Sequence, residues 1–231
     1  MTKRDAVKFV IVRSIGNFLV LFALFGVGAT FGPALYYEVS FRLLQFRGVQ
    51  FHVSEQETLV RQAAVRSDAP GFSDVLNSST KQILTPPDTD FSILIPKIGA
   101  SSRIFPNIDP SRQESFLPIL QEGVAHAEGT VFPGLSGNIY LFAHSTDNFW
   151  DVGRYNAIFY LIKDLSAGDE VVVFFENVRH NYIVSESKIV DAEDVSHITG
   201  AQTGEETLIL QTCWPPGTTW KRLLVFAKPK R

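Results

Sequence analysis

The feature that most constrains the fold of this chain is a long apolar stretch near its N-terminus. Residues 14–37 read SIGNFLVLFALFGVGATFGPALYY and contain no charged side chain. As a helix, this stretch rises about 36 Å at about 1.5 Å per residue, which is enough to cross a hydrocarbon core of about 30 Å. We therefore predict a transmembrane anchor at residues 14–37, in contact with membrane lipid, and a separate folded domain after it.

Two other interpretations of the stretch stay open. Small residues surround Ala29, as at the cleavage site of a signal peptide, but the apolar run is long for such a segment. The third interpretation is a buried helix of a soluble protein. We favour the uncleaved anchor because of its length.

Charges before the stretch predict the orientation of the anchor. Residues 1–13 hold four basic side chains and one acid, which are Lys3, Arg4, Lys8, Arg13 and Asp5. By the positive-inside rule, such a segment stays in the cytoplasm. We expect a single-pass membrane protein whose folded domain lies on the extracytoplasmic side.

The composition of the chain argues against a nucleic-acid partner and includes one cysteine. The chain has 21 basic and 24 acidic residues, a formal net charge of -3, which gives no surplus of positive charge for a nucleic-acid backbone. Cys213 is the single cysteine of the chain, so neither an internal disulfide nor a Cys-rich zinc site can form.

The residues after the anchor divide into a connector and a β-rich domain. Residues 38–90 are predicted to be an extracytoplasmic connector, because residues 67–90 concentrate Pro, Gly, Ser, Asp and Asn. Residues 91–231 are predicted to be the folded domain. Short apolar runs there predict strands. The segments between them at residues 111–123 and 154–168 predict short helices, the second of which ends at Gly168 as a C-terminal stop.

The expected strands lie in residues 91–99, 137–145, 168–190, 206–213 and 220–228, with a turn near Asn177 to His180 inside the third range. Many short strands with two brief helices predict a mainly β fold, a closed or nearly closed barrel. The alternation of apolar residues does not fix the order of the strands.

Cys213 stands at the end of an apolar run, before two prolines, and has two interpretations. It is either a small buried thiol of the core or a nucleophile, which needs a nearby base or positive charge. Of the five histidines, His144 follows the apolar run NIYLFA and therefore occupies a comparable strand end. Pattern alone does not decide between the two interpretations.

Three segments together, FSILIPKIG, LQEGVAHAEGTVFPGLSGNIYLFAHS and LILQTCWPPGTTWKRLLVF, resemble the sortases, membrane-anchored cysteine transpeptidases of bacterial surfaces. The resemblance runs from about Phe91 to Lys228. The Thr-Leu-x-Thr-Cys pattern of the family stands here as Ile209, Leu210, Gln211, Thr212 and Cys213. Two departures are Ile209 in place of Thr, and Ala143 in place of the Gly that usually precedes the family's catalytic histidine.

The resemblance implies a sortase-like barrel of about eight strands and a role for each matched residue. Cys213 would be the nucleophile, His144 the general acid and base, and Arg222 the residue that positions the substrate or its oxyanion. Thr212 and Ala143 are expected to contact the substrate, and Ala143 to narrow the site. The sortase class is not assignable.

The resemblance also implies a reaction and its partners. Cys213 would cleave an LPxTG-like C-terminal sorting signal of surface proteins between Thr and Gly, forming a thioester, and pass the acyl group to an amine of the cell envelope or of a pilin. No cofactor or metal is expected, although some sortases are stimulated by calcium. An inactive binding or assembly module and a hydrolytic cysteine peptidase of the same fold are the alternatives.

The predicted orientation can be tested on intact cells. Because the basic residues precede the anchor, protease added to intact spheroplasts should degrade the domain that begins at Phe91. Immunoblotting of the spheroplast fraction measures the loss. Complete protection of the domain, or a mature form that starts near Thr30, would contradict the anchored topology.

Overall fold

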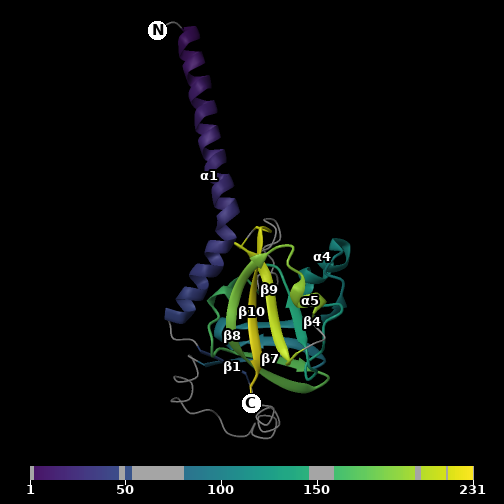
Figure 1. Ribbon diagram of the computed structural model, residues 1–231. Coiled ribbons are helices and arrows are strands. Elements are labelled where there is room, and N and C mark those ends of the chain that lie inside the picture. The colour runs from purple at the N-terminus through teal and green to yellow at the C-terminus, as the bar shows by residue number, and fades with distance from the viewer. Residues whose placement is uncertain are drawn as a thin grey trace, which may run out of the picture. The chain divides into compact units, whose positions relative to one another are not determined.

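The computed structural model describes residues 3–46, 50–53, 81–145, 159–200, 204–216 and 218–230 (Figure 1). Residues up to Leu43 belong to one compact unit, and a larger unit contains the β-structure. We describe the two units separately.

The described part of the first unit belongs to one long helix, α1 (Lys3–Phe46), whose last three residues fall in the second unit. Residues Val7–Ala29 are long and apolar enough to cross a membrane, by length and composition. Large apolar side chains along this segment are exposed, for example Phe18 and Phe22 at 65% and 64%. The helix extends past both ends of the predicted anchor at 14–37, so the first part of the predicted connector is helical as well.

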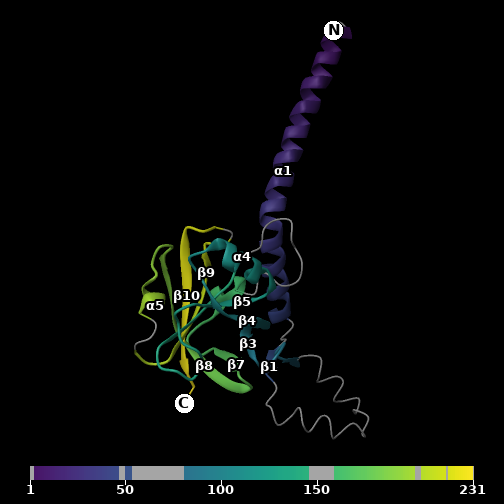
Figure 2. The same ribbon diagram turned by 90° about the vertical axis from the view of Figure 1, so that its right-hand side faces the viewer.

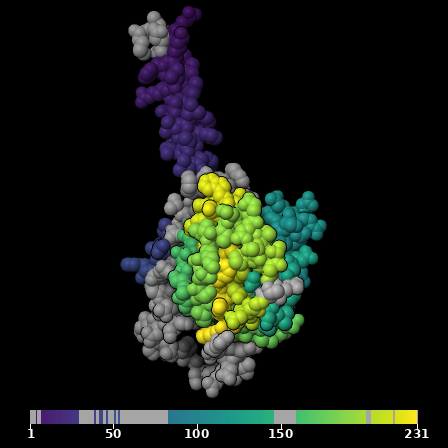
Figure 3. Space-filling view, viewed as in Figure 1, coloured from purple at the N-terminus to yellow at the C-terminus, as the bar shows by residue number. Residues whose placement is uncertain are grey.

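The second unit is a closed eight-stranded barrel, which confirms the predicted fold class. Its strands follow the order β10-β8-β7-β3-β4-β5-β6-β9 around the barrel. In chain order they are β3 (Phe91–Ile95), β4 (Ala100–Ile108), β5 (Val124–Ala127), β6 (Asn138–Phe142), β7 (Glu170–Phe175), β8 (Val178–Asp191), β9 (Thr207–Trp214) and β10 (Lys221–Pro229). The C-terminal strands, green to yellow, make up the face turned to the viewer in the space-filling view (Figure 3).

Short helices join the strands. They are η1 (Pro96–Ile98), α4 (Gln113–Glu122), η2 (Tyr160–Asp164) and α5 (Ser196–Thr199). The helix predicted at 111–123 is confirmed as α4, which lies against β4 and β5 (Figure 2). Of the helix predicted at 154–168, the described part is the single 3₁₀ segment η2, and residues 154–158 lie outside the described residues.

The sequence did not predict two strands of the barrel. β4 contains polar side chains and a proline, and β5 has four residues, so neither has a clear apolar period. The hairpin between β7 and β8 turns at Glu176 and Asn177, so it shares Asn177 with the predicted turn and begins one residue earlier.

A small parallel pair of strands precedes the barrel in sequence. It consists of β1 (Gln50–Val53) and β2 (Lys81–Leu84), which both fall in the predicted connector. Val53 and Leu84 pack against a buried cluster of Leu94, Val172 and Phe174 on the barrel, so β1 lies beside β3 and β7 (Figure 2). This part of the predicted connector is therefore attached to the folded domain.

The strands of the barrel wall are buried on both faces. Ile139, Leu141, Leu208 and Leu210 form the inner layer and are fully buried. The alternate residues of the same strands form an outer cluster with α4, which includes Tyr140, Phe142, Ile209, Leu224 and Phe226. Burial on both faces explains why these strands read as continuous apolar runs in the sequence.

His126 belongs to the inner layer, because β5 pairs it with Leu141. Its ring is fully buried and stacks on Phe132 at 4.6 Å between centroids. Its Nδ1 accepts a hydrogen bond from the backbone N–H of Asn107, and its Nε2 lies 3.0 Å from the carbonyl oxygen of Val131. A neutral ring with its proton on Nε2 satisfies both contacts, and burial lowers the pKa of His126.

This buried histidine predicts a loss of stability in weak acid. The unfolded chain takes up a proton on His126 near pH 6.5, whereas the folded chain resists it, so the free energy of unfolding should fall as the pH drops below about 6.5. Between pH 7.5 and pH 5.5 the loss from this one group reaches up to about 1.4 kcal/mol. Chemical denaturation at the two pH values measures it.

His126→Gln should be less stable than the wild-type chain at both pH values, but its free energy of unfolding should fall less between pH 7.5 and pH 5.5. Asp109 does not contribute in this window, because hydrogen bonds from Ser111 and Arg112 lower its pKa to about 2. An unchanged pH dependence in His126→Gln would contradict the assignment of a neutral ring.

Candidate active site

The parallel pairing of β6 with β9 brings two strand ends together. The register pairs Phe142 with Gln211, and the N–H of Ala143 continues the ladder to the carbonyl oxygen of Gln211 at 3.1 Å. β6 ends at Phe142, and extending its register by two residues places His144 across from Cys213, at the usual strand spacing of about 4.8 Å. The predicted base and the predicted nucleophile are therefore neighbours, although 69 residues separate them in the chain.

β10 brings a cation to the same place from the other side of β9. The antiparallel register pairs Arg222 with Cys213, and Nη1 of Arg222 lies 3.7 Å from the Sγ atom. The same Nη1 contacts the carbonyl oxygens of Thr219 at 3.1 Å and Lys221 at 3.2 Å. Within the described part of the chain, this guanidinium makes these contacts through Nη1 alone. Its N–H groups on Nε and Nη2 can therefore donate hydrogen bonds to a further acceptor.

The three side chains share the outer face of the barrel wall. Alternation places Cys213 on the face of Ile209 and Gln211, and places His144 on the face of Tyr140 and Phe142. Both residues are half-buried, as is Arg222. A half-buried thiol beside a cation and an imidazole is an arrangement suited to nucleophilic chemistry.

Thr212 and Ala143, the predicted substrate contacts, lie on the opposite face. They are 2% and 5% exposed and face the barrel interior. The hydroxyl of Thr212 donates a hydrogen bond to the carbonyl oxygen of Ala143 at 3.1 Å. The geometry thus gives the two residues a role in positioning the strand ends that carry Cys213 and His144. The methyl group of Ala143 does not narrow the space beside His144.

Gln211 lies next to the cysteine and contacts the buried Tyr140, and the sequence did not single out either as a site residue. Gln211 precedes Cys213 by two residues on the same face, and its Oε1 accepts a hydrogen bond of 3.4 Å from the hydroxyl of Tyr140. Burial raises the pKa of Tyr140, against the opposing effect of Arg222. The signal that could have found Gln211 is the period of two along the strand.

The other histidines lie away from this group. His126 faces the barrel interior, and His197 packs edge-on against Phe226 on the outer cluster at 5.2 Å between centroids. His180 lies at the other end of the barrel, on the first part of β8. The side chain of His52 lies outside the described residues.

Among the described residues, no three His, Cys, Asp or Glu side chains are grouped so that they could hold a metal ion. The expectation about calcium stays untested.

Comparison with known proteins gives the family. Residues 93–230, more than half of the chain, match the model of the sortase domain family. The chain belongs to the sortase family. Sortase D of Bacillus subtilis (strain 168) is 31% identical to this sortase over 137 residues, which are 58% of this chain and 60% of that protein. This sortase thus matches that curated relative over less than two thirds of the relative's length.

Solved sortase structures share the fold. Sortase C1 of Streptococcus agalactiae superposes with a TM-score of 0.52 at 25% identity, over 61% of this chain and 66% of that one. Sortase C-1 of Actinomyces oris superposes with a TM-score of 0.52 at 23% identity, over 72% of this chain and 85% of that one. These similarities agree with the closed eight-stranded barrel observed here.

The hydrogen bond between Thr212 and Ala143 makes a testable prediction about the two strand ends. Thr212→Val removes the hydroxyl and leaves a buried carbonyl oxygen without this donor, which should lower the free energy of unfolding by about 1–3 kcal/mol. Activity should fall as well, because the bond joins the residue before His144 to the residue before Cys213. Chemical denaturation and single-turnover rates measure the two effects.

Thr212→Ser is the matched control, because it keeps the hydroxyl and removes a methyl group. It should retain most of the activity and should be clearly more stable than Thr212→Val. Equal activity in the two variants would show that the hydrogen bond has no part in positioning the site.

Proposed function

We propose that this sortase is a cysteine transpeptidase that uses Cys213 as nucleophile, His144 as general acid and base, and Arg222 as the cation that stabilises the transition state. The observation that carries the proposal is the contact of 3.7 Å between the Arg222 guanidinium and the Cys213 sulfur, at the strand end that faces His144. The family gives the reaction class, and this geometry supports the assignment of roles.

In the first half of the reaction, the sulfur of Cys213 attacks the carbonyl carbon of a Thr in an LPxTG-like sorting signal. The tetrahedral intermediate collapses as the Thr–Gly C–N bond breaks, and His144 gives a proton to the leaving amine. The products are a thioester on Cys213 and a free peptide that begins with Gly.

In the second half, an amine of the cell envelope or of a surface protein attacks the thioester carbonyl. His144 takes a proton from this amine and passes it to the departing sulfur, so that a new amide bond forms, the thioester C–S bond breaks and the thiol of Cys213 is released. The net change joins the surface protein to the acceptor. With water in place of the amine, the same steps give hydrolysis, so the products distinguish the two reactions.

Arg222 acts on the charge that develops during both steps. Its planar guanidinium stays protonated, and its N–H groups beyond Nη1 can donate to a carbonyl oxygen that becomes an oxyanion near Sγ. Because that charge is largest in the transition state, the interaction lowers the barrier more than it strengthens substrate binding.

The N-terminal helix indicates on which side of the membrane the reaction takes place. Sortases are membrane-associated proteins, and α1 contains a segment that could cross the membrane. We infer that the barrel lies on the extracytoplasmic side, where surface proteins with a sorting signal and amine acceptors of the envelope are accessible.

The test combines trapping of the intermediate with rates. Incubation of the wild-type chain with a sorting-signal peptide and an amine should give a thioester adduct on Cys213, detected by mass spectrometry, and then the transfer product. Cys213→Ala should give neither, and His144→Ala should abolish transfer without unfolding the chain. An acyl adduct on Cys213→Ala would overturn the nucleophile assignment.

Substitutions at Arg222 and at its neighbour Lys221 form a matched pair that tests whether Arg222 is the cation that stabilises the transition state. Arg222→Ala should lower the rate of transfer by about 10²-fold or more, and Arg222→Lys nearly as much, because a point charge does not replace the planar fork. Lys221 is exposed, with its ammonium 3.5 Å from Asp191, so Lys221→Ala should retain near-normal rates. Near-wild-type turnover in Arg222→Ala would overturn the catalytic role.

A further inference from the structure

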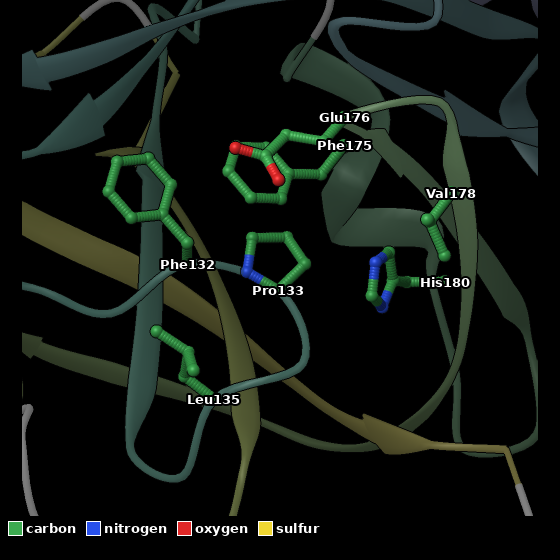
Figure 4. Close-up of a pocket in the computed structure, with 7 residues that line it drawn as sticks. All are labelled: Phe132, Pro133, Leu135, Phe175, Glu176, Val178 and His180. Carbon is green, nitrogen blue, oxygen red and sulfur yellow. The ribbon is translucent and has the colours of Figure 1, made fainter.

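The barrel has a concave site at the end opposite to Cys213. A groove of about 440 Å³ is lined by Phe132, Pro133, Leu135, Phe175, Glu176, Val178 and His180 (Figure 4). One wall is the loop that leads into β6, and the other is the hairpin between β7 and β8. Thr207 and Cys213, near the two ends of β9, are about 20 Å apart at about 3.3 Å per residue. The groove is therefore separate from the site of the proposed transfer.

The groove is the mouth of the barrel interior. Along β7 and β8 the residues Phe175, Val178 and His180 follow the inward face, since the register pairs Phe175 with Val178 and the buried Val173 with His180. Mouths of β-barrels are frequent places for ligand sites, because the barrel wall supplies a rigid rim.

An aromatic layer closes the floor of this mouth. Phe132 stacks on Phe175 at 5.0 Å between centroids and on His126 at 4.6 Å. Phe91 meets the edge of Phe175 at 5.0 Å. A ligand in the groove would thus rest on aromatic faces rather than enter the core.

Both walls are held by hydrogen bonds from elsewhere in the barrel, so the groove is formed in advance. Glu206 accepts hydrogen bonds from the N–H of Gly134 at 2.8 Å and from the hydroxyl of Tyr182 at 2.7 Å. Gly134 has a φ of 88°, which favours glycine, and a Cβ atom there would lie 3.3 Å from the ring of His180, so a side chain would be strained and would crowd this ring. On the hairpin, the N–H of Glu176 donates to Asp90 at 2.9 Å.

The surface of the groove is mostly apolar, with one acidic group and the imidazole of His180. Leu135 and Val178 are apolar but 55% and 54% exposed. Among the lining residues, Glu176 is the acidic one, and neither lysine nor arginine is present. The complement of such a surface is an apolar or aromatic side chain next to a positive charge, which gains from burial, from the carboxylate and from the aromatic faces.

Glu176 is an unusual residue for the hairpin turn in which it lies. It has a φ of 50° and Asn177 has a φ of 64°, so the two residues form a two-residue hairpin turn with positive φ at both positions. Gly, Asn or Asp are the usual residues of such a turn, whereas Glu is strained there. Residues held in strained backbone regions are concentrated at functional sites.

From these observations we propose that the groove at the mouth of the barrel, opposite to Cys213, binds a partner polypeptide through a segment in which an aromatic or branched apolar side chain stands next to a lysine or arginine. Leu135 and Val178 cover the apolar side chain, and Glu176 pairs with the cation. The groove is a docking site distinct from the substrate site, and its binding does not depend on turnover at Cys213.

The experiment uses the full chain in nanodiscs of zwitterionic lipid, with empty nanodiscs as reference. The probe is acetyl-(4-fluorophenylalanyl)-lysine amide, observed by fluorine NMR line broadening, and the control peptide has glutamate in place of lysine. We expect saturable broadening of the lysine peptide and an affinity at least about threefold lower for the glutamate peptide. Raising the salt from 50 to 500 mM should narrow this difference.

Three variants locate the binding. Glu176→Gln should weaken the lysine peptide by about threefold to fivefold, and Leu135→Ser by about tenfold, while both leave the transfer rate unchanged. Glu176→Asn should raise Tm by about 2 °C or more, since it relieves the strained turn, and should weaken the peptide as Glu176→Gln does.

Two results would overturn the proposal. The first is equal binding of the two peptides, or binding that Glu176→Gln and Leu135→Ser leave unchanged. The second is binding that is lost in Arg222→Ala, which would place the peptide at the cysteine site. Because the readout is binding, a failure of the transpeptidase assignment would not change either outcome.

Discussion

The parallel pairing of β6 with β9 is the constraint on which the candidate site depends. The register from Asn138 and Thr207 to Phe142 and Gln211 fixes which residues meet where the two strands end. The buried hydrogen bond from Thr212 to Ala143 extends this register past the last regular pair. A shift by one residue would turn His144 and Cys213 to opposite faces, because side chains alternate along a strand.

Burial on both sides of the barrel wall makes this register rigid. The inner layer leaves no room for a slip, and the outer cluster with α4 covers the same strands from the other side. Cys213 and Arg222 lie just beyond the outer cluster, and their side chains are half-buried. A rigid scaffold with side chains that emerge at its end keeps reacting groups in place without further support.

The two ends of the barrel differ in chemistry. The end that carries Cys213 presents a thiol, an imidazole and a guanidinium, and its charges can act on a reacting carbonyl group. The other end is closed by the aromatic layer around Phe175 and presents an apolar groove with a carboxylate. One fold thus offers a reactive surface and a recognition surface that can be changed independently, because about 20 Å of wall lies between them.

The sequence by itself determined the class of fold and singled out the residues that are predicted to carry chemistry. Cys213 and His144 could be placed at strand ends, and the resemblance of three segments to the sortases added their roles and that of Arg222. The β-rich pattern and the long apolar N-terminal segment predicted the barrel and the helix. Local patterns carry that information, because an apolar run and its end are visible within a few residues.

Only the tertiary structure decided which side chains face one another. β4 and β5 were too polar or too short to be recognised, the opposite faces of Thr212 and Cys213 required a register, and the groove at Glu176 is assembled from segments that are about 40 residues apart in sequence. Pairing of distant strands depends on how the whole barrel closes, and no local pattern contains that closure.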